Sequence, residues 1–127
     1  MNLRWFTAPL IIVVILLGWQ ILTAGRSFVP LDGEEAWDLW ATEQVTVLDV
    51  SEQTMFERRH IPGSVNIEIG DLRGSLDSWN KDDPVLVVST RGSRSAAAAN
   101  LLIVTGFQRV YHLQGGLENW PGPTETR

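Results

Sequence analysis

The residues best placed to do chemistry in this chain lie in one short loop, residues 89–95, with the sequence Ser-Thr-Arg-Gly-Ser-Arg-Ser. Four apolar residues come directly before the loop and four alanines directly after it, which predicts a buried strand, a loop and a helix. The N–H groups of such a loop converge at the positive end of the helix dipole. Arg91 and Arg94 add two positive charges. The loop therefore predicts a binding site for a small anion.

The first loop residue, Ser89, decides which reaction this site can perform. A helix N-terminus and neighbouring arginines lower the pKa of a thiol, so a cysteine at this position would be a reactive thiolate. The chain has a serine there and contains no cysteine. A serine hydroxyl needs a general base, and no base is evident near Ser89 in the sequence. We favour a structural role for Ser89 over an anion contact or a weak hydroxyl nucleophile.

The remaining polar residues of the predicted site divide into binding and supporting groups. We expect Arg91 to contact the ligand, and Arg94 to organise the loop through a carboxylate or carbonyl groups. Asp49 ends another predicted strand at the same sheet edge and is expected to hold loop amides or Arg94. His60 lacks a paired carboxylate or cysteine, so we assign it loop support, and we expect His112 to be structural or solvent-facing. The predicted anion-binding loop comprises Ser89, Thr90, Arg91, Gly92, Ser93, Arg94 and Ser95.

The composition of the chain limits the kinds of molecule that it is expected to bind. The chain has 127 residues and a net charge of −5, and every acidic residue lies after Gly25. The part that follows is mildly acidic and has no basic tract, which argues against nucleic acid or an anionic membrane surface as a partner. The sequence has no spacing typical of a metal site, and we expect no cofactor.

The N-terminal segment, residues 8–25, is apolar and lies between Arg4 and Arg26 without any charge. As a helix it would span about 27 Å, close to the ~30 Å hydrocarbon core of a bilayer. Aromatic residues suited to the membrane interface flank it, namely Trp5, Phe6 and Trp19. Arg4 and the N-terminal amine favour a cytoplasmic N-terminus. We therefore expect a single-pass anchor with the rest of the chain on the periplasmic or extracellular side.

A cleaved signal peptide is the alternative for the same segment. Gly18 interrupts the apolar run, and the small residues 23–25 suit a signal peptidase. Both alternatives export the domain that follows. We divide the chain into a cytoplasmic stub at 1–7, the anchor or signal peptide at 8–25, a folded domain at 26–120 and a loose tail at 121–127.

Strand and helix patterns alternate along the folded domain. Apolar, β-branched runs predict five strands, at residues 28–31, 45–50, 65–67, 85–88 and 109–113. Helices are predicted between them, with Asp32 and Ser51 as N-caps, a start near Ser95 for the longest helix and Gly106 just after its end. The alternation predicts an α/β fold whose parallel sheet is covered on both faces. Ligands of such sheets bind at the carboxyl ends of the strands, where the 89–95 loop and Asp49 lie.

Several short motifs occur in a fixed order along residues 29–120. They are Leu48-Asp49-Val50, Glu57 before His60-Ile61-Pro62-Gly63-Ser64-Val65-Asn66, Gly92-Ser93-Arg94-Ser95, Gly106-Phe107 with Val110, and Leu113-Gln114-Gly115-Gly116-Leu117-Glu118-Asn119-Trp120. In this order and spacing they resemble the rhodanese-like (sulfurtransferase) domain family. The resemblance implies a three-layer fold of about five mostly parallel strands, with helices on both faces, here preceded by the predicted transmembrane helix.

The resemblance also implies a persulfide mechanism, in which a loop cysteine takes sulfane sulfur from thiosulfate and passes it to cyanide or a thiol. Family loops run from that cysteine through four residues to an arginine, so alignment on Arg94 places Ser89 at the cysteine position. Ser51 stands where the family commonly has arginine. We therefore expect an inert module that binds a small oxyanion (sulfate, thiosulfate or phosphate) or a protein partner.

Two other functions stay open from the sequence. One is an active sulfurtransferase or phosphatase-like enzyme that works through Ser89 or through the thiol of a partner. The other is a purely structural domain beside another membrane protein. A sulfur-transfer assay distinguishes the enzyme from an inert module. Anion titration distinguishes a purely structural domain from an inert module that binds an anion.

Overall fold

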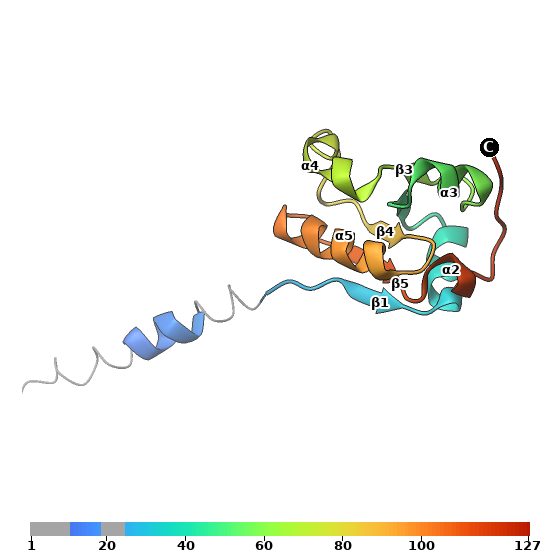
Figure 1. Ribbon diagram of the computed structural model, residues 1–127. Coiled ribbons are helices and arrows are strands. Elements are labelled where there is room, and N and C mark those ends of the chain that lie inside the picture. The colour runs from blue at the N-terminus through green and yellow to red at the C-terminus, as the bar shows by residue number, and fades with distance from the viewer. Residues whose placement is uncertain (1–10, 19–24) are drawn as a thin grey trace, which may run out of the picture.

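The computed structural model describes residues 11–18 and 25–127 (Figure 1). Residues 11–18 form a helix. Across the described ranges, none of the helices combines the length and the apolar character needed to cross a membrane. The rest of the predicted 8–25 anchor, apart from residue 25, lies outside these ranges, so the anchor stays a prediction.

Five parallel strands form one sheet in the order β1-β5-β4-β2-β3. This confirms the predicted α/β fold with a five-stranded parallel sheet. The central strand, β4, is buried along its whole length, as its unbroken apolar sequence predicts. The strands are β1 (Val29–Leu31), β2 (Thr46–Asp49), β3 (Val65–Asn66), β4 (Val85–Val88) and β5 (Val110–Leu113).

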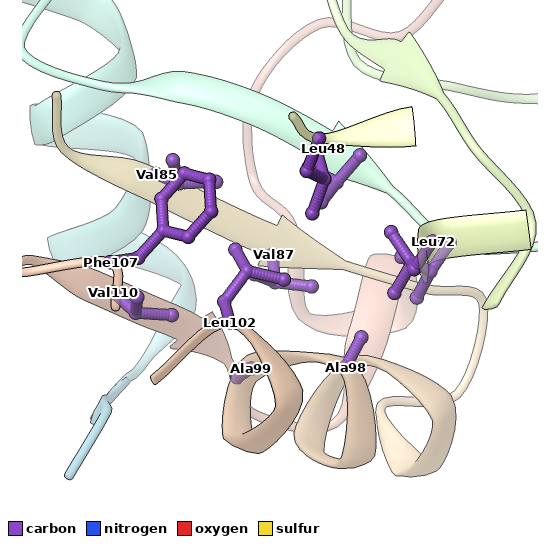
Figure 2. Close-up of a cluster of buried hydrophobic side chains, with 11 residues drawn as sticks. Leu48, Leu72, Val85, Val87, Ala98, Ala99, Leu102, Phe107 and Val110 are labelled. Atoms are coloured by element: carbon purple, nitrogen blue, oxygen red, sulfur yellow. The ribbon is translucent and has the colours of Figure 1, made fainter. Parts of the chain in front are cut away.

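Helices cover both faces of this sheet and make a three-layer domain. They are α2 (Gly33–Ala41), α3 (Gln53–Arg58), η1 (Ile69–Asp71), α4 (Leu72–Ser75), α5 (Ser93–Val104) and η2 (Gly116–Asn119). One hydrophobic cluster joins α5 and α4 to the sheet through residues such as Leu72, Ala98 and Leu102 (Figure 2). The second cluster lies on the other face and includes Ala36 of α2 and Leu117 of η2.

Two of the three predicted helix signals hold. The Asp32 carboxylate accepts a hydrogen bond from the Glu35 N–H at 2.9 Å and so caps α2. Gly106 has a φ of 106° and ends α5 with the two backbone hydrogen bonds of a Schellman motif. The predicted cap at Ser51 is wrong, because α3 starts after Glu52 and the Ser51 hydroxyl bonds to Thr90 instead. The longest helix, α5, begins at Ser93, two residues before the predicted start.

The C-terminal tail, predicted to be loose, packs back onto the domain. His60 and Glu125 form an antiparallel bridge with backbone N–O distances of 3.0 and 2.9 Å. The Arg127 N–H donates to the Glu57 carbonyl of α3 at 2.9 Å. These partners could not be read from local composition, because the tail bonds to a segment at least 65 residues away in the chain.

Candidate anion-binding site

The 89–95 loop and the segment after β2 meet at the carboxyl edge of the sheet. β2 and β4 are direct neighbours in the sheet, so the residues that follow them come together. They line an open pocket of ≈ 300 Å³, formed by Ser51, Glu52, Met55, Ser89, Thr90, Arg91, Ser93 and Arg94. The structure therefore brings most of the predicted loop residues around one hollow.

The Ser89 hydroxyl fills the inner part of the loop. Its Oγ accepts hydrogen bonds from the Gly92 N–H at 3.0 Å and the Ser95 N–H at 3.2 Å. It donates to the Ser95 Oγ at 3.1 Å, which in turn donates to the Gly92 carbonyl at 3.0 Å. Ser89 is only 2% exposed. The two deepest amides of the loop are thus satisfied by the chain itself.

The backbone N–H groups in the outer part of the loop differ in whether the described residues supply an acceptor. The Thr90 N–H donates to the Ser51 Oγ at 3.1 Å. The N–H groups of Arg91, Ser93 and Arg94 have no acceptor within the described residues. Because these groups lie at the start of α5, they combine with the positive end of its dipole. These three N–H groups are the loop donors that the described residues leave without an acceptor, and they belong to residues that line the pocket.

The two loop arginines have different surroundings. Arg94 bonds to the Glu52 carboxylate, with an Nη2–Oε1 distance of 2.9 Å, and both side chains are about half exposed. Arg91 is exposed, lines the pocket and has no ion-pair partner in the part of the chain that the structure describes. Arg94 thus ties the loop to the residue that precedes α3, and Arg91 is the cation left for a ligand.

Asp49 lies beneath the pocket and holds Ser51. Its Oδ1 accepts from the Ser51 N–H at 2.9 Å, and its buried Oδ2 has no partner among the described residues. Burial raises the pKa of Asp49, and this effect is partly opposed by the hydrogen bonds from Ser51 and by charge on His60. The predicted contact of Asp49 with loop amides or Arg94 is wrong. Asp49 instead holds the backbone of Ser51, which forms part of the pocket wall.

Both histidines form structural hydrogen bonds, but His112, and not His60, supports the loop. The His60 ring stacks on Phe56 and bonds to the Phe56 carbonyl at 2.7 Å and the Glu125 carboxylate at 3.2 Å. It therefore joins α3 to the tail, and the predicted support of the loop is wrong. His112 is buried, and its Nε2 lies 3.0 Å from the Gly92 carbonyl. Sequence reasoning missed this loop support.

The alternation of side chains along β5 could have predicted that His112 is buried and needs a hydrogen-bond partner. Its neighbours on β5, Tyr111 and Leu113, pack on the face covered by α2, so His112 points to the α5 face. His112 pairs with Val87 of β4, two residues before Ser89. A polar side chain on a buried face beside the end of β4 needs a hydrogen-bond partner, and the loop supplies it.

Glycines allow the turn after β5 to brace the loop. Gly116 has a φ of 73°, and a Cβ atom there would lie 2.5 Å from the Thr90 carbonyl oxygen and 2.6 Å from that of Ser89. Gly92 has a φ of 91°, with the Gly115 nitrogen 3.0 Å from where its Cβ would be. The Leu117 N–H also donates to the Ser89 carbonyl at 3.0 Å. Only glycine permits this approach.

A five-stranded parallel sheet with a short polar loop between its central strand and a helix defines the class of fold. The family model for the rhodanese-like domain matches residues 32–122, and the chain belongs to this family. The thiosulfate sulfurtransferase GlpE of Coxiella burnetii is 34% identical over 86 residues, which are 68% of this chain and 80% of GlpE. The putative sulfur carrier protein YrkF of Bacillus subtilis is 34% identical over 83 residues, which are 65% of this chain but only 45% of YrkF.

Solved structures support the same assignment. A rhodanese-like domain from Anabaena sp., solved by solution NMR, has a TM-score of 0.69 and 28% identity and covers 80% of each chain. A structure described as a rhodanese with anions, from E. coli, has a TM-score of 0.58 and 25% identity. It covers 65% of this chain and 98% of that one.

Proposed function

We propose that this protein is a membrane-tethered rhodanese-like module that binds a small oxyanion at the 89–95 loop and does not transfer sulfur. The observation that carries the proposal is the Ser89 hydroxyl, which accepts from the N–H groups of Gly92 and Ser95. We infer that this oxygen occupies the position of the family's reactive sulfur. A hydroxyl cannot form a persulfide, and the chain contains no cysteine that could replace it.

Loss of the thiol leaves the anion-binding part of the loop in place. Arg91, Ser93 and Arg94 line a pocket of ≈ 300 Å³, and within the described residues their N–H groups have no acceptor and the Arg91 side chain has no ion-pair partner. A related rhodanese has been solved with anions, which supports the same class of ligand here. Because the pocket is open to water, we expect weak binding, with dissociation constants near ~1 mM, equivalent to about 4 kcal/mol.

We infer the membrane tether from the N-terminal sequence, residues 8–25. Residues 8–25 contain no charge and are long enough as a helix to approach the width of a bilayer. Arg4 and the N-terminal amine favour a domain on the non-cytoplasmic side. Retention on a membrane would place the anion site close to membrane proteins, which are the partners we propose for it.

Substitution of Arg91 tests the anion site. Arg91→Ala removes the one unpaired cation of the pocket, so the affinity for thiosulfate, sulfate and phosphate should fall about tenfold, or about 1.4 kcal/mol. Calorimetric titration at low salt measures this change. Arg73→Ala is the matched control, because Arg73 is exposed and does not line this pocket. An equal loss in both variants, or no saturable binding to the wild type, would overturn the proposal.

A further inference from the structure

The position of the tether fixes which end of the domain faces the membrane. β1 begins at Val29, four residues after the apolar segment ends. All five strands are parallel, so the chain enters the sheet at the edge where every strand begins. The anion site lies beyond the carboxyl ends of β2 and β4, at the opposite edge. In Figure 1 the chain reaches β1 from the left, and the strands point to the right.

The connection between segment and domain is short because Phe28 already belongs to the domain. Phe28 packs against the hydrophobic cluster beneath α5, and its ring meets His112 edge to face at 5.6 Å. Only Arg26 and Ser27 remain as a free connection. Fully extended, the chain from residue 25 to residue 28 reaches about 10 Å. A domain held by so short a connection cannot turn its opposite edge toward the lipid.

We infer that the amino edge of the sheet rests on the lipid headgroups and that the anion pocket opens away from the membrane. This inference rests on the proposed tether. The amino edge carries the end of α5, where Val104 is 75% exposed, together with the exposed Lys81 and Arg109. An exposed apolar residue and two cations on one edge suit the boundary of acyl chains and phosphate groups. Asp82 and Asp83 on the same edge keep the attraction weak, so the tether sets the orientation.

This orientation decides how a ligand reaches the site. β4 alone spans about 13 Å, and the loop lies beyond it, so the pocket stands clear of the headgroups. Dissolved oxyanions can enter the pocket directly. A membrane protein can contact it only through a part that extends well beyond the lipid surface.

Because the chain has no cysteine, single cysteines can report the orientation without background. Val104→Cys marks the amino edge, and Glu118→Cys marks the exposed η2 turn at the carboxyl edge. Each full-length variant is labelled with a fluorescent maleimide and reconstituted in phosphatidylcholine vesicles. The vesicles contain lipids with a spin label on the headgroup, which quenches nearby fluorophores. The label at position 104 should be quenched at least about twofold more than the label at position 118.

A flotation step separates the two ways in which this can fail. If the full-length chain does not float with the vesicles, the tether and the orientation are both wrong. If it floats and the two labels are quenched equally, or the label at 118 more strongly, the orientation alone is overturned. A flexible insertion of ten residues after Ser27 should abolish the difference while the chain still floats. A difference that survives the insertion would contradict control by the short connection.

Discussion

At the scale of single residues, hydrogen bonds decide what the site can do. The buried Ser89 hydroxyl accepts two hydrogen bonds and donates one, so its hydrogen-bonding capacity is satisfied within the protein. Among the described residues its acceptor is the Ser95 hydroxyl, which is not a base that would take its proton. Arg91 differs from Arg94 in lacking a carboxylate partner within the described residues, and for that reason we propose Arg91 as the cation that contacts the ligand.

Asp49 gives a prediction about pH. Because burial raises its pKa above the ordinary value of 3.8, the folded protein keeps the proton of Asp49 to a higher pH than the unfolded chain does. The stability that this proton supports is present below 3.8 and is lost as the pH rises through the raised pKa. The amide introduced by Asp49→Asn does not ionise and keeps an acceptor for the Ser51 N–H. The free energy of unfolding of Asp49→Asn, relative to wild type, should therefore increase from about pH 3 to pH 7.

Urea unfolding at several pH values measures this difference. Asp77→Asn is the control, because Asp77 is exposed and lies outside the site. A difference between Asp49→Asn and wild type that stays constant with pH would show that the buried carboxyl is not protonated preferentially in the folded state.

At the scale of elements, close contact between two turns shapes the loop. The turn at residues 115–116 lies against the 89–92 stretch, and its glycines remove the side chains that would separate them. Gly116→Ala should push the loop outward and weaken anion binding. Gly63→Ala is the matched control, because Gly63 has a φ of 77° but no atom within 4 Å of its Cβ position.

The two alanine variants should therefore differ in stability. The conformational strain alone should cost Gly63→Ala about 1–2 kcal/mol. Gly116→Ala should lose about 1–3 kcal/mol more, because its methyl group meets backbone that cannot move freely. Thermal unfolding measures both losses. Equal losses and unchanged anion affinity in the two variants would contradict a bracing role for the turn.

Local patterns predicted the elements well, and long-range contacts explain the exceptions. The apolar run of β4, the Asp32 cap and the Gly106 end of α5 depend on neighbouring residues, so the sequence reveals them. The loop partner of His112 is 20 residues away and the tail partner of His60 is 65 residues away, although His60 also bonds to the Phe56 carbonyl four residues away. The two distant partners depend on how the whole chain folds, which a single sequence does not specify, so the contacts of His112 with the loop and of His60 with the tail were missed.

At the scale of the whole molecule, the sheet sets where the candidate site lies, and the proposed tether would hold the opposite edge of the domain at a membrane. The described residues show a domain that starts at Phe28 and whose C-terminal tail closes on α3. The site lies at the far edge from the entry of the chain. The function that we propose therefore depends on whether residues 8–25 act as the predicted anchor.

Membrane fractionation tests the anchor. After alkaline carbonate extraction of cells that express the full-length chain, we expect the protein in the membrane pellet, because an apolar segment of this length stays in lipid. A variant with Leu16→Arg and Leu17→Arg should move to the supernatant, since charge at the centre of the segment opposes insertion. A soluble wild-type chain that starts near Arg26 would establish a cleaved signal peptide and exclude the tether.

The most direct measurement of the central claim is sulfur transfer from thiosulfate to cyanide by wild type and by Ser89→Cys. The new thiol would lie between the Gly92 and Ser95 amides at the start of α5, so its pKa should fall below the ~8.5 of a free cysteine. Ser93→Cys is the control, an exposed thiol in the same pocket without those two amides. We expect no thiocyanate above background from wild type, and both thiocyanate and a persulfide, detected by mass, from Ser89→Cys alone. Transfer by the wild type would contradict the account.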